Sequence, residues 1–101
     1  MIPPVSEGLE KDLETLPDEV SIALVNWRTA TIDREMKEAL LYLKYKNSED
    51  KRTEGEVKAL INSNNERYDI KLKEALAEAE YNKLYERLMS SKRLAALRTA
   101  Y

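Results

Sequence analysis

The sequence has no cysteine, no histidine and no phenylalanine, and it holds only two glycines and three prolines. Without Cys or His, a Ser-His triad, a thiol nucleophile, a structural zinc centre and a disulfide framework are all excluded. Two isolated glycines exclude a phosphate-cradling loop. So few turn-forming residues, together with a single Trp, also argue against a β-barrel or a β-sandwich.

Long hydrophobic runs are missing as well. No run approaches the roughly 18 apolar residues of a membrane span, and the first residues lack the basic and apolar regions of a signal peptide. We therefore expect no membrane partner and a soluble protein of the cytoplasm, which would be the bacterial host cytoplasm if a phage encodes it.

The residues that are abundant favour helix. Ala, Leu, Glu, Lys and Arg dominate, and these are the residues with the highest helix propensity. With 101 residues, 43% of them hydrophobic, and a net charge of −2, the chain is expected to fold as one domain.

The first 16 residues are punctuated by Pro3, Pro4 and Gly8 and are predicted to be an acidic, loosely ordered arm, with room for a short turn of helix around Leu9, Leu13 and Leu16. Pro17 followed by two acidic residues predicts a helix start, because proline fits the first turn and acids there complement the helix dipole. Residues 17–101 are then a single helical domain. The arm either lies over basic groups of its own or a neighbouring subunit, or serves as a solubilising tail.

From Pro17 to about Lys46 nothing breaks the helix. Apolar side chains recur at alternating spacings of three and four residues, which is a heptad pattern. The residues of this stripe are Ile22, Val25, Thr29, Ile32, Met36, Ala39 and Leu43. Further apolar residues, Val20, Leu24, Trp27, Leu40 and Leu41, widen the face.

Two more helices are predicted beyond a polar loop. Thr53 and Glu56 have the spacing of a capping box, which opens a short helix containing Val57. After a break at residues 62–65, a long helix extends to about Arg98. Its apolar stripe consists of Ala77, Tyr81, Leu84, Leu88, Ser91 and Ala95. The predicted fold is all-α: an elongated helical hairpin of two long helices with a short capped helix between them.

A thin hairpin shields its apolar stripes poorly, because each helix covers only part of its partner. Either the arm and the short helix fold back to close the core, or the remaining stripe is a subunit interface. The heptad content favours a homo-oligomer. The predicted oligomer interface consists of Ile22, Val25, Ile32, Met36, Leu43, Leu84 and Leu88.

The carboxylates alternate with basic residues on what the pattern indicates are solvated helix faces. Arg34 with Glu38 and Lys71 with Glu74 and Glu78 show this helical spacing. No carboxylate pair stands in an apolar setting that would shift its pKa, and no acidic cluster is specific for a metal. We therefore predict no enzyme, no metal and no cofactor.

The basic residues gather around the first loop and at the C-terminal end, where Arg87 to Tyr101 contains four bases and no acid. Basic side chains with interleaved tyrosines are typical of single-strand binding. The alternative is that the bases complement the helix dipole and the tyrosines pack on the partner helix. The candidate nucleic-acid-binding residues are Lys44, Lys46, Lys51, Arg52, Tyr42 and Tyr45.

The order of features resembles a known family. A Trp early in a long helix leads into the segment 43–46 (LKYK), a polar basic loop, the segment 52–61 (RTEGEVKALI) and a Tyr-bearing helix that ends in Ser-Lys-Arg-Leu. This pattern resembles the small helical phage recombination mediators of the UvsY type. The resemblance implies a ring-forming protomer that binds single-stranded DNA and helps to load a RecA-like recombinase. It carries over Lys44 and Lys46 as DNA contacts, although Lys46 stands where the family has Arg.

Two hypotheses follow. The first is an oligomeric single-stranded-DNA-binding accessory protein of phage recombination. The second is a non-enzymatic helical protein–protein interaction module, such as a phage adaptor or inhibitor, without nucleic acid contact. A virion or assembly component is a third possibility, which differs only in where the protein is found.

Overall fold

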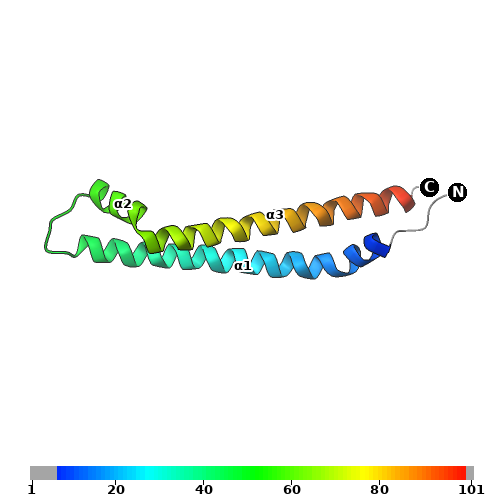
Figure 1. Cartoon of the computed structure of the whole chain (residues 1–101), viewed down its shortest axis with the longest axis horizontal. Helices are drawn as coiled ribbons and strands as arrows, with labels where there is room; N and C mark the ends of the chain where they lie inside the picture. The colour runs from blue at the N-terminus through cyan, green and yellow to red at the C-terminus, as the bar shows by residue number, and fades with distance from the viewer. Residues whose placement is uncertain (1–6, 100–101) are drawn as a thin grey trace.

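A computed structural model of the chain describes residues 7–99, which form three helices and no strands (Figure 1). The helices are α1 (Glu7–Lys46), α2 (Glu54–Ser63) and α3 (Asn65–Thr99). The long helices α1 and α3 lie antiparallel along each other, and α2 lies at the end where the chain turns back. The predicted all-α helical hairpin with a short helix between the long ones is confirmed.

The start of α1 differs from the prediction, because the helix begins at Glu7 rather than Pro17. Pro17 lies inside the helix, where it removes one backbone hydrogen bond. Burial outweighs this cost, since Leu9 is 8% exposed and Leu16 is 0% exposed. The prediction of a loosely ordered arm is therefore wrong for residues 7–16, which are helical. Residues 1–6 of the predicted arm lie outside the described residues.

The two long helices meet along a seam that runs the length of the hairpin. The buried apolar residues of α1 along this seam are Leu9, Leu16, Ala23 and Leu41. On α3 the predicted stripe does face α1, with Leu88 and Ser91 buried and the rest half-buried. Near the middle, the Trp27 and Tyr81 rings pack with their centroids 5.4 Å apart.

The stripe that the heptad pattern singled out on α1 lies on a different side from the seam. Ile22, Val25, Ile32, Met36 and Leu43 are each 55 to 61% exposed. The residues that pack in the seam are instead others on α1, such as Ala23, which follows Ile22 in the sequence. A search for large apolar residues does not find Ala23. Thus α1 carries two apolar faces, and the hairpin covers one of them.

The junction of α2 and α3 is held by Asn64, the single residue between them. Its backbone N–H donates to the Ile61 carbonyl at 3.2 Å, and its side-chain Oδ1 accepts from the Arg67 backbone N–H at 3.0 Å. Its Nδ2 donates to the Tyr45 hydroxyl of α1 at 3.1 Å. One residue therefore caps two helices and ties them to a third. At the other end of α2, Thr53 accepts from the Glu56 backbone N–H, as the capping pattern predicted.

We expect Asn64→Ala to lower the free energy of unfolding by about 1 to 2 kcal/mol, because an N-cap side chain is lost together with a part-buried side-chain hydrogen bond. Urea unfolding followed by circular dichroism measures this change. The matched control is Asn62→Ala, which removes an exposed amide from α2. Equal losses in the two variants would contradict the role of Asn64.

Candidate interaction surfaces

The six predicted nucleic-acid-binding residues gather at one end of the hairpin. We call this end the tip; it consists of residues 42–56, from the last turn of α1 to the start of α2. Arg52 bonds back to α1 there, because its Nη1 donates to the Tyr45 carbonyl at 3.1 Å and to the Ser48 Oγ at 2.7 Å. The Arg52 guanidinium also lies 5.6 Å from the centroid of the Tyr45 ring. Arg52 and Tyr45 thus hold the C-terminal end of α1 against the loop.

Two more of the predicted residues converge on Glu54. The Tyr42 hydroxyl donates to the Glu54 Oε1 at 2.9 Å, and the Lys46 Nζ lies 3.0 Å from the same oxygen. The hydrogen bonds from Lys46 and Tyr42 hold the Glu54 pKa below its ordinary value. The same contacts raise the pKa of Lys46 and of Tyr42. The carboxylate therefore neutralises a base that the pattern assigned to a phosphate.

The remaining two bases are less engaged. The Lys44 Nζ lies 5.9 Å from the Tyr45 ring centroid, and its charge contributes to a lowered pKa at Glu66 after the larger effect of Lys37. Lys51 is exposed in the loop. The acids Glu49, Asp50, Glu54 and Glu56 stand in the same segment. The tip is consequently a mixed-charge cluster in which most of the bases already have partners.

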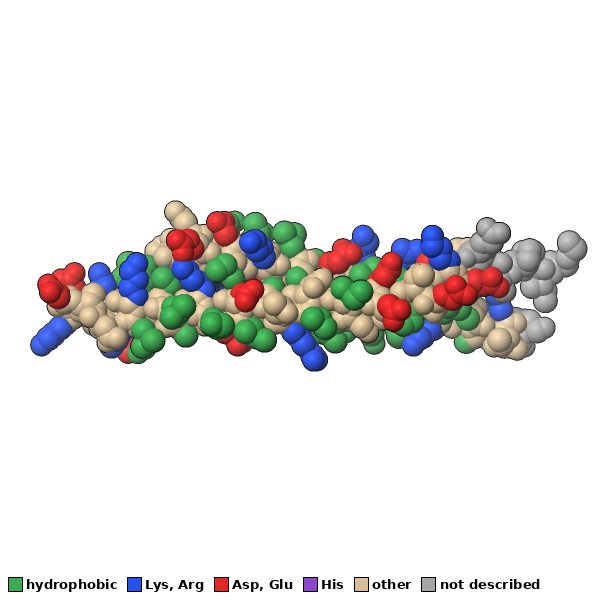
Figure 2. All heavy atoms as spheres, turned by 90° about the horizontal axis from the view of Figure 1, so that it is seen from below, with side chains coloured by type: hydrophobic (Ala, Val, Ile, Leu, Met, Phe, Trp, Pro, Cys, Tyr) green, Lys and Arg blue, Asp and Glu red, His purple; other side chains and the backbone are tan. Residues whose placement is uncertain are grey.

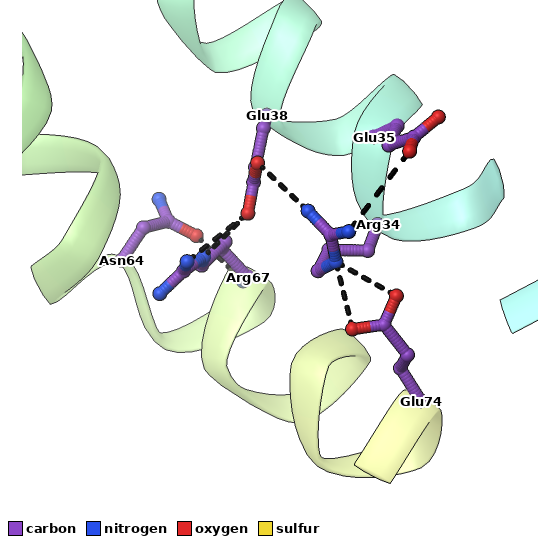
Figure 3. Close-up of polar contacts among 6 residues, drawn as sticks. All are labelled: Arg34, Glu35, Glu38, Asn64, Arg67 and Glu74. Carbon is purple, nitrogen blue, oxygen red and sulfur yellow. Dashed lines mark hydrogen bonds and ion pairs between the residues drawn. The ribbon is translucent and has the colours of Figure 1, made fainter. Parts of the chain in front are cut away.

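A second polar cluster sits on the seam itself, away from the tip (Figure 3). The Arg34 Nε donates to both carboxylate oxygens of Glu74 at 2.8 Å, and its Nη1 donates to Glu38 at 3.2 Å. The Arg67 Nε donates to the other oxygen of Glu38 at 3.0 Å. We call Arg34, Glu38, Arg67 and Glu74 the seam network; it pairs two positive with two negative charges. Lys37 and Glu66 form a further ion pair from α1 to α3.

The seam network corrects the interpretation of these carboxylates as part of a solvated face. The side chains of Arg67 and Glu74 are only 14% and 15% exposed, and they bridge helices rather than following one. Breaking a partly buried pair leaves an uncompensated charge, so the network favours one register of α3 on α1.

We expect the contribution of Glu74 to stability to be lost in acid. Burial opposes its ionisation, but hydrogen bonds from Arg34 and Thr31 and the Arg34 charge hold its pKa below the ordinary value of 4.5. A carboxyl whose pKa is lowered by folding stabilises the fold fully above its unfolded pKa and loses that effect as the pH falls. The unfolding free energy of wild type should therefore exceed that of Glu74→Gln by about 1 to 3 kcal/mol at pH 7, and the difference should shrink below pH 4.5. A difference that is constant from pH 7 to pH 3 would contradict this.

The open end of the hairpin is closed by an ion pair from the predicted arm. The Arg87 Nη2 lies 2.6 Å from Asp12 Oδ1, and its Nε donates to Oδ2 at 3.2 Å. The sequence analysis left open whether the acidic segment contacts basic groups or serves as a solubilising tail. Asp12 contacts a basic group of its own chain, Arg87.

A third surface feature is the apolar face that α1 turns away from the seam. We call its residues the outward stripe: Ile22, Val25, Thr29, Ile32, Met36, Ala39 and Leu43. Figure 2 views the hairpin from the α1 side and shows hydrophobic side chains in a broken line along the rod, with charged groups beside them. A shallow groove between α1 and α3 borders the stripe, and Met36, Leu40 and Ile70 contribute to its lining.

Two of the predicted interface residues are placed elsewhere. Leu88 is 6% exposed and packs in the seam, and Leu84 on the same face is half-buried. These two leucines therefore pack between α1 and α3 of the same chain rather than at an interface between chains, because the α3 stripe is the face that meets α1. The other five predicted interface residues all lie on the outward stripe.

Sequence reasoning missed the seam network and Glu54. Arg34 and Glu74 are forty residues apart, so helical spacing within one helix cannot show that they meet. Arg34 and Glu38 share the helical spacing of Leu16, Ala23 and Leu41, which identifies them as seam residues once those three are known to be buried.

Comparisons with protein-family models, with curated proteins and with solved structures found no match. The resemblance to recombination mediators therefore stays a prediction. Within residues 7–99, no group of three or more acidic side chains is arranged to hold a metal ion. None of the three described helices combines the length and the apolar character needed to cross a bilayer.

Proposed function

We propose that this chain is a non-enzymatic helical assembly module that associates through the outward stripe of α1. The observation that carries the proposal is the exposure of Ile22, Val25, Ile32, Met36 and Leu43, five large apolar side chains at heptad spacing, each more than half exposed. Large apolar side chains at heptad spacing on an exposed face are typical of a helix that packs against another helix.

The test is Ile32→Asp, which places a carboxylate in the middle of the outward stripe. Each associating copy would lose a buried Ile side chain, worth about 1.5 to 3 kcal/mol, so the association constant should fall by about 100-fold or more. Light scattering across a dilution series measures the change. The matched control is Leu97→Asp, which changes an apolar side chain on α3 that is 59% exposed. Equal association of wild type and Ile32→Asp would exclude the stripe as the interface.

Single-stranded nucleic acid binding at the tip is a second candidate function. The observation that favours it is the gathering of Lys44, Lys51 and the other predicted residues at one end, around an exposed loop. An assembly would bring several tips to one strand, where weak contacts add. A RecA-like recombinase would be a further partner only if the chain binds single-stranded nucleic acid in this way.

A labelled oligonucleotide at low salt tests this candidate. Replacing Lys44 and Lys46 by Ala should weaken binding for all sequences, whereas Glu54→Gln should strengthen it several-fold, because it releases Lys46 and Tyr42. Lys83→Ala on α3, which lies away from the tip, is the control. Absence of binding by wild type at low salt would exclude the candidate.

A further inference from the structure

We propose that the outward stripe is covered by a second copy of this chain, and that the two α1 helices run antiparallel. The inference rests on the proposed function and adds the partner and its orientation. The outward stripe follows a heptad pattern with a fixed order of large and small residues. Each orientation of a second α1 helix therefore specifies which side chains meet.

Between residues 22 and 39 the antiparallel arrangement sets each large residue against a smaller or differently shaped one, whereas Leu43 lies beyond this stretch and faces the partner's Asp18. Ile22 faces the partner's Ala39, Val25 faces the partner's Met36, and Ile32 faces the partner's Thr29. A parallel pair would instead set Thr29 against itself and Ala39 against itself, which gives one polar layer and one underfilled layer. Facing large with small side chains is what fills a helical interface.

The charges that flank the stripe fit the same orientation. Arg28 and Glu35 precede stripe positions by one residue, and both are exposed; the Glu35 side chain is 65% exposed although it lies 4.0 Å from Arg34. In the antiparallel register given above, Arg28 lies beside the partner's Glu35, and the twofold axis repeats this pair. A parallel pair would give Arg28 the partner's Asp33 instead, also twice, so the flanking charges are compatible with both orientations and the packing of the stripe decides between them.

The ends of the rod carry a second, independent indication. The first turns of α1 are acidic, with Glu10, Glu14 and Asp18 exposed, whereas the last turn carries Lys44 and Lys46. Antiparallel packing brings the acidic first turns of one α1 to the last turn of the other, where Lys44 is exposed and Lys46 is already paired with Glu54. Parallel packing would align like charges at both ends, which disfavours that partner arrangement.

The arrangement has a consequence for function. It makes a rod that presents one tip at each end, with about 45 Å between the two Lys46 Cα atoms, because the axis lies near residue 30 and a helix rises 1.5 Å per residue. The parallel alternative would place both tips side by side.

Cysteine crosslinking tests the orientation, since the chain has no Cys of its own. Val25→Cys and Met36→Cys face each other in the proposed dimer, but each lies about 16 Å from its own counterpart, which is too far for a disulfide. An oxidised equimolar mixture should give the mixed dimer at least tenfold above either homodimer, as identified by mass spectrometry.

A spin label at Lys51→Cys provides a readout that leaves the stripe unchanged. The label-to-label distance should be at least about 45 Å, whereas a parallel dimer would give a short distance. Ready homodimer crosslinks at Val25→Cys, a short label distance, or no mixed crosslink between variants of a dimeric wild type would each overturn the orientation while leaving self-association intact. A wild-type chain that stays monomeric would overturn both this inference and the proposed function.

Discussion

Leu16→Ala is expected to lower the free energy of unfolding by about 2 to 4 kcal/mol. Leu16 is fully buried, and it lies in the segment of α1 that precedes Pro17. Alanine is the better helix former, so any loss of stability must come from the cavity and not from helix propensity. Urea unfolding monitored by circular dichroism gives the value directly.

The control for Leu16→Ala is Leu97→Ala, which removes the same atoms from an exposed position on α3 near the same end of the hairpin. It should cost well under 1 kcal/mol. If the two variants lost the same small amount, residues 7–16 would behave as a loose arm, and the packing of this segment in the hairpin would be contradicted.

Glu74→Arg is expected to destabilise the hairpin by about 3 kcal/mol, because it replaces the partner of Arg34 with a like charge on the seam. Arg34 would then face a cation across the helices, and Glu38 would remain as the sole carboxylate of the seam network. Thermal and urea unfolding at pH 7 measure the loss.

The double variant Arg34→Glu/Glu74→Arg restores the pair with its direction reversed and should recover part of the loss. Recovery is expected to be partial, because a carboxylate at position 34 would lie beside Glu35 and Glu38 on the same helix. A double variant no more stable than Glu74→Arg would show that the two side chains do not interact.

Most of the fold was predictable because helical patterning is local. The end of α1 at Lys46, the cap at Thr53 and the α3 stripe from Ala77 to Ala95 follow from spacing and capping chemistry within a few residues. Proline at position 17 misled the prediction of the helix start. The local preference of proline for a first turn is real, but long-range burial of Leu9 and Leu16 against α3 overrode it.

The division of α1 into two faces could not be predicted. The stripe from Ile22 to Leu43 keeps an unbroken heptad spacing, whereas the seam is interrupted by the small Ala23 and the charged Arg34, so the apolar pattern alone selects the wrong face for the core. What decides the seam is the match to α3, where Glu74 and Arg67 provide partners for Arg34 and Glu38. Such complementarity between distant residues is visible only once the helices are paired.

The predicted tip residues illustrate the same limit. The pattern placed Lys46 and Tyr42 among the candidate contacts, but it gave no indication that Glu54 from the next helix would bind both of them. The carboxylate is near in sequence, yet its position depends on how the loop returns α2 to α1.

Sedimentation equilibrium of the wild-type chain from low to high micromolar concentration tests the central claim most directly. If the outward stripe is an interface between copies, the apparent mass should rise with concentration from 11.7 kDa toward twice that value. A folded, helical chain that keeps a mass of 11.7 kDa over the whole range would contradict the account.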